Sequence, residues 1–314
     1  MLLKSRPLSV RPARSLLVAI LVLAAGLAAS SGGSTAKSTN AGGRGKAKGQ
    51  PKCGDTITAS TTLHKDLVAC PNNGIVIGAD GITLDLNGHL IGGDGTLTSG
   101  CNSEKEFCDT GVVNEGHDGV TVMHGSIRRF GGGVTLFGVR KNRLQDVSTS
   151  DDHFNGIQLF NASQSVVRDS SGHGPNEEIG LGSFSSHRIR LVHNSFRDTA
   201  LLGIVVSGGA RNLVEGNKVR GAGKKAPRDG DGIAVDAEAK HTILRRNSAS
   251  HSRDDGFDVE GSTTKITKNS AVRNRDLGIE AVRGVIDGGG NIAHHNGDPR
   301  QCTHVACKSS GASG

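Results

Sequence analysis

The sequence predicts an all-β solenoid, in which short strands stack coil upon coil around a shared core. A glycine followed by an apolar residue recurs at Gly111, Gly133, Gly156, Gly180, Gly203, Gly232, Gly256 and Gly278. Successive starts lie 22 to 24 residues apart, except for one interval of 29 that indicates an insertion before Gly232. A unit of this length is too short to fold alone, so neighbouring units must stack to bury a core.

A second signal follows each glycine by 13 to 15 residues, where an Asn or Asp stands beside apolar residues. We interpret this series as a polar ladder in the turn between two strands of each coil, where stacked side chains bond one another and the backbone. A row of ligands is the alternative interpretation. The series is Asp146, Asp169, Asn194, Asn217, Asn247, Asn269 and Asn291.

The combined rhythm of Gly-Ile-x-Val and Asn-x-Val resembles the right-handed parallel β-helix repeat proteins, the superfamily of pectate lyase-like and NosD-like solenoids. The resemblance covers residues 53–300 and implies a single right-handed parallel β-helix of roughly nine coils. It does not select an activity, because this fold hosts lyases, hydrolases, epimerases and proteins without catalysis.

The chain ends predict an exported protein. Residues 1–30 combine basic residues, an apolar run and small residues, which is typical of a secretory signal peptide and not of a membrane span. Residues 31–52 predict a disordered, basic Gly/Ser/Lys linker. The β-helix is expected at 53–307 and a flexible tail at 308–314, in a secreted or cell-envelope-associated monomer.

The β-helix is expected to open with a cap, in which 56–58 form a strand and 63–69 a short helix or turn. Six cysteines in an exported chain favour disulfides. Proximity suggests Cys53 with Cys70 in this cap, Cys101 with Cys108 in a loop, and Cys302 with Cys307 at the C-terminal end. A zinc cluster of Cys302, His304 and Cys307 with His294 and His295 is the alternative at that end.

Charge and aromatic content restrict the partners. Nine of the 37 Lys and Arg residues precede Cys53, and all 30 acidic residues follow it, so 53–314 carry 28 basic residues and a net charge of −2. The predicted solenoid therefore lacks the charge expected of a nucleic-acid binder. The chain has no Trp or Tyr, which argues against the usual stacking platforms for neutral sugars.

The repeat gathers carboxylates on one face of three consecutive coils. Equivalent residues of successive coils lie about 4.8 Å apart. The outward strand positions supply Asp236, Asp258, Glu260 and Glu280, and the turns before the strands supply Asp229, Asp231, Asp254, Asp255 and Asp276. Such crowding raises the pKa of at least one carboxyl group or recruits a cation.

Two chemistries fit this face. Paired carboxylates act as general acid and base on a glycosidic bond. Alternatively, Asp255, Asp258 and Glu280 hold Ca²⁺ that neutralises a uronate. The catalytic candidates are Asp255, Asp258, Asp276 and Glu280, and the substrate-binding candidates are Asp231, Arg253, Asp254, Glu260, Arg283 and His173. A purely structural interpretation is that Asp is simply a preferred turn residue before Gly.

The segment from Arg253 to Val259, Arg-Asp-Asp-Gly-Phe-Asp-Val, resembles the acidic turn-and-strand signature of polygalacturonases. This resemblance implies Asp255 and Asp276 as catalytic acids. The sequence departs from that family one coil later, where it has Asn-Gly-Asp at 296–298 in place of Gly-His-Gly and no Arg-x-Lys follows.

Two functions remain open from the sequence. In the first, a secreted β-helix binds an acidic polysaccharide along the acidic face and cleaves it, as a polysaccharide lyase or a glycoside hydrolase. In the second, the chain is a noncatalytic extracellular or wall-associated scaffold. Neither involves a nucleic acid or a membrane span.

Overall fold

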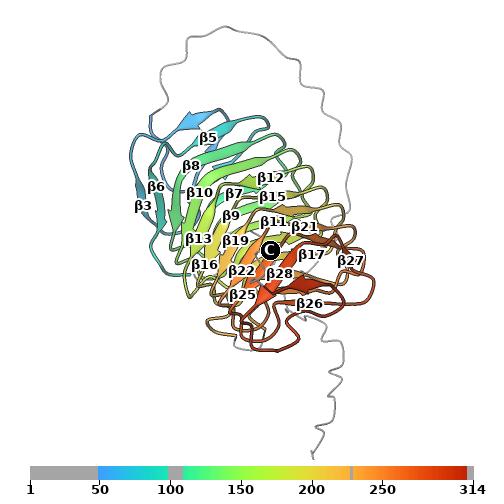
Figure 1. Ribbon diagram of the computed structural model, residues 1–314. Coiled ribbons are helices and arrows are strands. Elements are labelled where there is room, and N and C mark those ends of the chain that lie inside the picture. The colour runs from blue at the N-terminus through green and yellow to red at the C-terminus, as the bar shows by residue number, and fades with distance from the viewer. Residues whose placement is uncertain (1–48, 98–108, 227–228, 310–314) are drawn as a thin grey trace, which may run out of the picture.

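The chain folds into a parallel β-solenoid. The computed structural model describes residues 49–97, 109–226 and 229–309, and all helical or strand structure among them is β-strand. The chain makes about ten turns, one for each strand of the ten-stranded sheet on one face (Figure 1). The all-β solenoid is therefore confirmed, with close to the expected number of coils. The predicted signal peptide, most of the linker and the Cys101–Cys108 pair lie outside the described residues.

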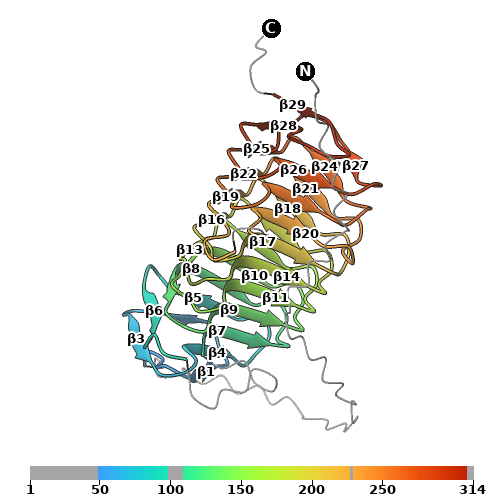
Figure 2. The ribbon, with the colours of Figure 1, turned by 90° about the horizontal axis from the view of Figure 1, so that it is seen from below.

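Sheet A, the ten-stranded sheet, contains the strands that begin at the repeated glycines. Each strand pairs in parallel with the equivalent strand of the next coil, and the strands follow one another along the solenoid axis (Figure 2). Its strands are β1 (Asp55–Ile57), β4 (Ile75–Ile77), β7 (Thr110–Glu115), β9 (Gly132–Phe137), β11 (Asn155–Phe160), β14 (Ile179–Phe184), β17 (Leu202–Ser207), β20 (Ile233–Val235), β23 (Phe257–Val259) and β26 (Ile279–Ala281).

The remaining strands form two rows, which complete each coil. Row 1 holds β2 (Thr61–Thr62), β5 (Thr83–Asp85), β12 (Val166–Arg168), β15 (Arg190–Val192), β18 (Leu213–Glu215), β21 (Ile243–Arg245), β24 (Lys265–Thr267) and β27 (Ile286–Asp287). Row 2 holds β3 (Leu67–Cys70), β6 (Leu90–Gly93), β13 (Ser171–His173), β16 (Ser195–Arg197), β19 (Lys218–Arg220), β22 (Ser248–Ser250), β25 (Ser270–Val272), β28 (Asn291–His294) and β29 (Cys307–Lys308). The long strands β8 (Thr121–Arg128) and β10 (Arg143–Ser150) run through both rows.

The repeated glycines begin the sheet A strands because a side chain would not fit there. A Cβ atom at Gly203 would lie 2.3 Å from Val219 Cγ1 and 2.6 Å from the carbonyl oxygen of Gly232, the next glycine of the series. Inward residues such as Ile204 and Phe257 are fully buried in the core. Stacked glycines therefore let adjacent coils approach closely while the following apolar residues fill the interior.

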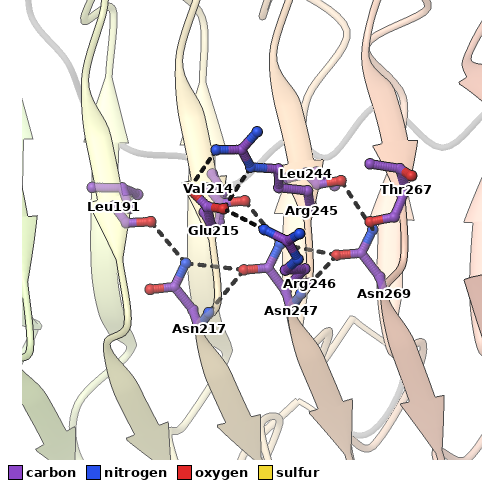
Figure 3. Close-up of polar contacts among 10 residues, drawn as sticks. All are labelled: Leu191, Val214, Glu215, Asn217, Leu244, Arg245, Arg246, Asn247, Thr267 and Asn269. Atoms are coloured by element: carbon purple, nitrogen blue, oxygen red, sulfur yellow. Dashed lines mark hydrogen bonds and ion pairs between the residues drawn. The ribbon is translucent and has the colours of Figure 1, made fainter. Parts of the chain in front are cut away.

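The polar ladder is confirmed for the five asparagines of the series, which are all buried. Asn217 donates through Nδ2 to Leu191 O at 2.8 Å and to Asn247 Oδ1 at 3.0 Å (Figure 3). Asp146 and Asp169 were predicted wrongly as members. Both are exposed and have a left-handed backbone conformation, with φ of 52° and 50°. Ser170 extends the ladder instead, because its backbone N–H donates to Asn194 Oδ1.

Both described ends are tied as expected. Cys53–Cys70 and Cys302–Cys307 are disulfides, which confirms the disulfide-tied cap and removes the thiolates that the zinc cluster would need. Residues 63–69 contain no helix, because Leu67 begins β3, which packs beside β6. Among residues 49–97, 109–226 and 229–309, no helix has the length and hydropathy needed to cross a membrane.

Candidate functional site

The acidic face is built on β20, β23 and β26. Asp258 on β23 lies directly opposite Ala234 on one side and Glu280 on the other. Asp258 points outward, because its strand neighbours Phe257 and Val259 are buried in the core. The two carboxylates therefore occupy one outward column on adjacent strands, and adjacent strands lie about 4.8 Å apart.

The turns before these strands bring further carboxyl groups together. Asp254, Asp255 and Asp276 each offer an oxygen, and these oxygens lie within 4.8 Å of one another. Asp255 Oδ1 also accepts the N–H of Leu277 at 2.6 Å, and Asp231 Oδ1 accepts the N–H of Asp255 at 2.9 Å. Asp231 and Asp255 therefore form a short ladder that holds the turns of successive coils in register.

Burial shifts the protonation of this cluster. It raises the pKa of Asp255 to about 11, an effect increased by Asp231 and by a hydrogen bond with Glu280. It raises the pKa of Asp258 to about 8, and the nearby Glu260 and Glu280 add to the shift. The pKa of Asp231 is also well above its usual value, chiefly through burial. Asp258 is the only one of the three that is partly exposed, so it can present a proton to a ligand at neutral pH.

Of the substrate-binding candidates, Glu260 directly follows β23, and its charge contributes to the raised pKa of Asp258. Arg253 is exposed, and its backbone N–H donates a hydrogen bond to Ala222 O at 2.9 Å. This bond attaches it to the insertion between β19 and β20. Arg283 lies in the exposed turn after β26, at the opposite end of that strand from the turn acids.

Two other predicted residues have different surroundings. His173 lies on β13 in row 2, separated from β22 of the Asp255 coil by β16 and β19, so the structure does not bring it to the acids. Asp236 accepts hydrogen bonds from the hydroxyl of Ser207 and from the N–H of Gly208, which commits it to a turn.

Of the predicted calcium set, Asp255 clusters with Asp254 and Asp276 and also contacts Glu280, which lies opposite Asp258 in the adjoining strand column. Calcium takes six to eight oxygen ligands, so three carboxylates would need other donors to complete a site. The same spacing suits carboxyl groups that share protons, which agrees with the raised pKa of Asp255.

The sequence interpretation missed Arg300. Its guanidinium pairs with Asp298 at 2.6 Å, and the negative charges of Asp276 and Glu280 contribute to its raised pKa. The spacing contained a signal, because Asp298 follows Asp276 by 22 residues, the length of one coil. A cation therefore lies beside the acidic face.

An aromatic column on the outer face of sheet A was also missed. Phe137, Phe160 and Phe184 pair directly across β9, β11 and β14, and each follows its repeat glycine by four residues. The rings of Phe160 and Phe184 stack with centroids 4.7 Å apart, while Phe137 is 38% exposed. Phe184 belongs to an apolar cluster with Ile179, Leu202, Val205 and Ala234 that is separate from the interior core.

The outer column of Val205 and Ala234 leads directly to Asp258 and Glu280. One face of the solenoid thus carries an aromatic and apolar half followed by an acidic half. The absence of Trp and Tyr does not leave this face without aromatic rings.

Several solved structures resemble the chain at low sequence identity. Alginate lyase from Paenibacillus sp. str. FPU-7 is 14% identical, with a TM-score of 0.48 over 76% of this chain and 90% of that one. Endopolygalacturonase I from Stereum purpureum is 11% identical, with a TM-score of 0.48 over 83% and 90%. The A-module of the mannuronan C-5 epimerase AlgE6 from Azotobacter vinelandii is 10% identical, with a TM-score of 0.41 over 76% and 60%.

No curated protein sequence matches the chain. A family model does match, under the description of a right handed beta helix region, over residues 69–219 and 175–312. These two segments together span well over half of the 314 residues. The parallel solenoid has the architecture that this description names. The chain belongs to the right-handed β-helix family.

Proposed function

We propose that this chain is a secreted protein that binds a polysaccharide, including acidic ones, along the outer face of sheet A and hydrolyses a glycosidic bond beside Asp258 and Glu280. The observation that carries the proposal is the direct pairing of these two carboxyl groups across β23 and β26. The two disulfides support export, because such bonds persist in oxidising compartments.

Glycoside hydrolysis needs one carboxyl group that stays protonated and a second that acts as base or nucleophile. Asp258 suits the first role, because burial raises its pKa to about 8 and it remains partly exposed. It would donate its proton to the glycosidic oxygen as the bond to the anomeric carbon breaks. Glu280 would supply the second carboxylate, and a water molecule would form the new bond to the anomeric carbon and give up a proton to a carboxylate.

The aromatic and apolar half of the face would bind the sugar chain. Phe137 exposes part of its ring, and the column continues through Phe160 to Phe184. Three rungs separate β14 from β23, which is about 14 Å along the axis. A chain of several sugar rings would therefore contact the phenylalanines and the acids at once. Protonation of Asp231, Asp255 and Asp258 would reduce repulsion of a uronate.

A noncatalytic scaffold is the second candidate, and one observation favours it. Asp231 and Asp255 accept backbone N–H groups of neighbouring turns, so part of the acidic cluster has a structural function. In this alternative, Asp258 and Glu280 would be surface residues without a reaction.

The test is incubation of the folded protein with a panel of acidic and neutral polysaccharides, with Ca²⁺ and with EDTA. Release of reducing ends and the ultraviolet absorbance of unsaturated uronates would both be followed. The proposal expects reducing ends without unsaturated product. Unsaturated product that requires Ca²⁺ would replace hydrolysis by a lyase reaction, and no release from any polymer would favour the scaffold.

A further inference from the structure

A basic groove runs along one corner of the solenoid, where the chain passes from sheet A into row 1. Five consecutive coils stack there through parallel bridges that join Arg140, Ser163, His187, Ala210 and Lys240 in that order. The next residues of four of these coils, Gln164, Arg188, Arg211 and His241, complete the lining of a groove of about 600 Å³.

The shape of the groove follows from the alternation of side-chain size. Ser163 and Ala210 are small, and they separate the larger Arg140, His187 and Lys240 along the bridged column. The following residues all take the left-handed conformation, as at Arg188 with φ of 55° and Arg211 with φ of 59°. Because each coil makes the same turn, equivalent side chains stay in register over four rungs, which is about 19 Å.

The charge of the groove is of one sign. Four Arg or Lys residues and two His residues line it, and no carboxylate does. At one end Arg140 pairs with Asp118 at 3.0 Å. Within the described part of the chain, neither Arg188 nor Arg211 has a salt bridge, and both are exposed. The sequence from Cys53 onward carries a net charge of −2, so this concentration of cations is local.

We propose that this groove binds an anionic polysaccharide, one with carboxylate or sulfate groups, which runs parallel to the solenoid axis. Arg188 and Arg211 lie on adjacent coils, and each guanidinium can donate two parallel hydrogen bonds to one anionic group. His187 and Ala210 pair on adjacent coils, so Arg188 and Arg211, which follow them, lie one coil apart. The two arginines therefore contact successive anionic groups of the polymer. The anionic groups repeat along the polymer as the basic side chains repeat from coil to coil along the groove.

A single-stranded nucleic acid fits the groove less well. Such ligands are held by aromatic side chains on which bases stack, interleaved with basic residues. No Phe lines the groove, and the chain has no Trp or Tyr. The groove also follows the sheet A strands, whereas the turn acids precede them, so the two regions lie at opposite ends of those strands. The groove proposal therefore does not depend on catalysis at the acidic face.

The test compares the full-length protein with Arg188→Glu/Arg211→Glu and with the milder Arg188→Gln/Arg211→Gln. Gln already occupies the equivalent position at Gln164, so the milder variant preserves a side chain that this turn accepts. The matched control is Lys218→Glu/Lys265→Glu, which makes the same charge change on exposed residues of β19 and β24. Circular dichroism and the melting temperature check the fold of each variant.

Affinity is measured for polygalacturonate, chondroitin sulfate, dextran and a single-stranded oligonucleotide. We expect the wild type to bind the two anionic polysaccharides, with an affinity that falls as salt is added. The charge reversal in the groove should lower that affinity by about tenfold or more, and the neutral variant by less. The control should keep wild-type affinity, and dextran binding should not differ among the variants.

Three outcomes would overturn the proposal: wild-type affinity for both anionic polysaccharides in the charge-reversed groove variant, an equal loss in the control, or tighter binding of the oligonucleotide than of either polysaccharide.

Discussion

Asn247 Oδ1 accepts two hydrogen bonds from Asn217 of the preceding coil, one from its backbone N–H at 2.9 Å and one from its side-chain amide at 3.0 Å. Asn217 Oδ1 accepts the same two bonds from Asn194, at 2.8 and 3.0 Å. The arrangement satisfies backbone groups in a buried turn that the strand rows leave unpaired. It also fixes the register of one coil on the next.

Asn217→Ala should lower the free energy of unfolding by about 3 kcal/mol, because it leaves buried donors of Asn194 and the carbonyl of Leu191 without their partner. Urea unfolding measures the effect. Lys218→Ala, at the exposed next residue, is the control and should change the free energy by less than about 0.5 kcal/mol. Equal effects of the two substitutions would mean that the ladder does not stabilise the fold.

Asp152→Asn should stabilise the protein. Asp152 is fully buried, its Oδ1 accepts the N–H of Phe130 at 2.9 Å, and its Oδ2 has no partner among the described residues. Asn274 has the equivalent place, four residues before a repeat glycine, and there the amide donates to Ala249 O at 3.3 Å. Burial raises the pKa of Asp152, so the carboxyl group must bind a proton to fit a position suited to Asn.

The gain from Asp152→Asn should be at least about 1 kcal/mol at pH 8 and should shrink as the pH falls, because the raised pKa of the wild-type carboxyl group makes its protonation cost less at lower pH. Unfolding in urea at pH 8 and at pH 5 tests this. Thr242→Val, which replaces another buried polar side chain, controls for general effects of substitution. A loss of stability in Asp152→Asn at pH 8 would mean that the charged form is required.

The repeat predicted the coils and the outward columns of side chains. The glycine spacing indicates which residues of successive coils pair, and the alternation along each strand indicates which side chains point outward. This is how Asp258 and Glu280 could be placed in one column from the sequence. The backbone bonds of Asp231 and Asp255 could not be predicted, since the direction of a turn side chain depends on the turn. The groove arginines were missed because Arg188 and Arg211 lie outside the strands, where alternation does not show which side chains line one groove.

Stability should fall as the pH rises through the neutral range. The pKa of Asp258 rises from 3.8 to about 8 on folding, and that of Glu177 rises from 4.5 to about 8, in both cases mainly through burial. Between the unfolded and folded values, the folded state keeps protons that the unfolded state has lost. Each such group therefore contributes stability at low pH that is lost as the pH rises toward 8.

One proton held only by the folded state corresponds to about 1.4 kcal/mol per pH unit. Urea midpoints from pH 5 to 8 should therefore decline, and Asp258→Asn should reduce the slope. A midpoint that rises over this range would contradict the protonated state of the cluster.

Phe137→Ala should weaken polysaccharide binding without unfolding the protein, because Phe137 is the most exposed ring of the aromatic column. We expect a loss of about fivefold in affinity, which corresponds to about 1 kcal/mol. Affinity electrophoresis in gels that contain the polymer measures it. Ile286→Ala, at an exposed apolar residue on β27, should leave affinity unchanged. Unchanged binding by Phe137→Ala would remove the aromatic column from the sugar site.

The turnover of Asp258→Asn on a polysaccharide that the wild type cleaves tests the central claim most directly. Glu280→Gln is measured in parallel, and Glu238→Gln, at an exposed carboxylate two residues after Asp236, is the control. If Asp258 donates the proton, its substitution should lower the rate by about 100-fold or more, while the control keeps the wild-type rate. Cleavage by folded Asp258→Asn at the wild-type rate would show that the reaction does not occur on this face.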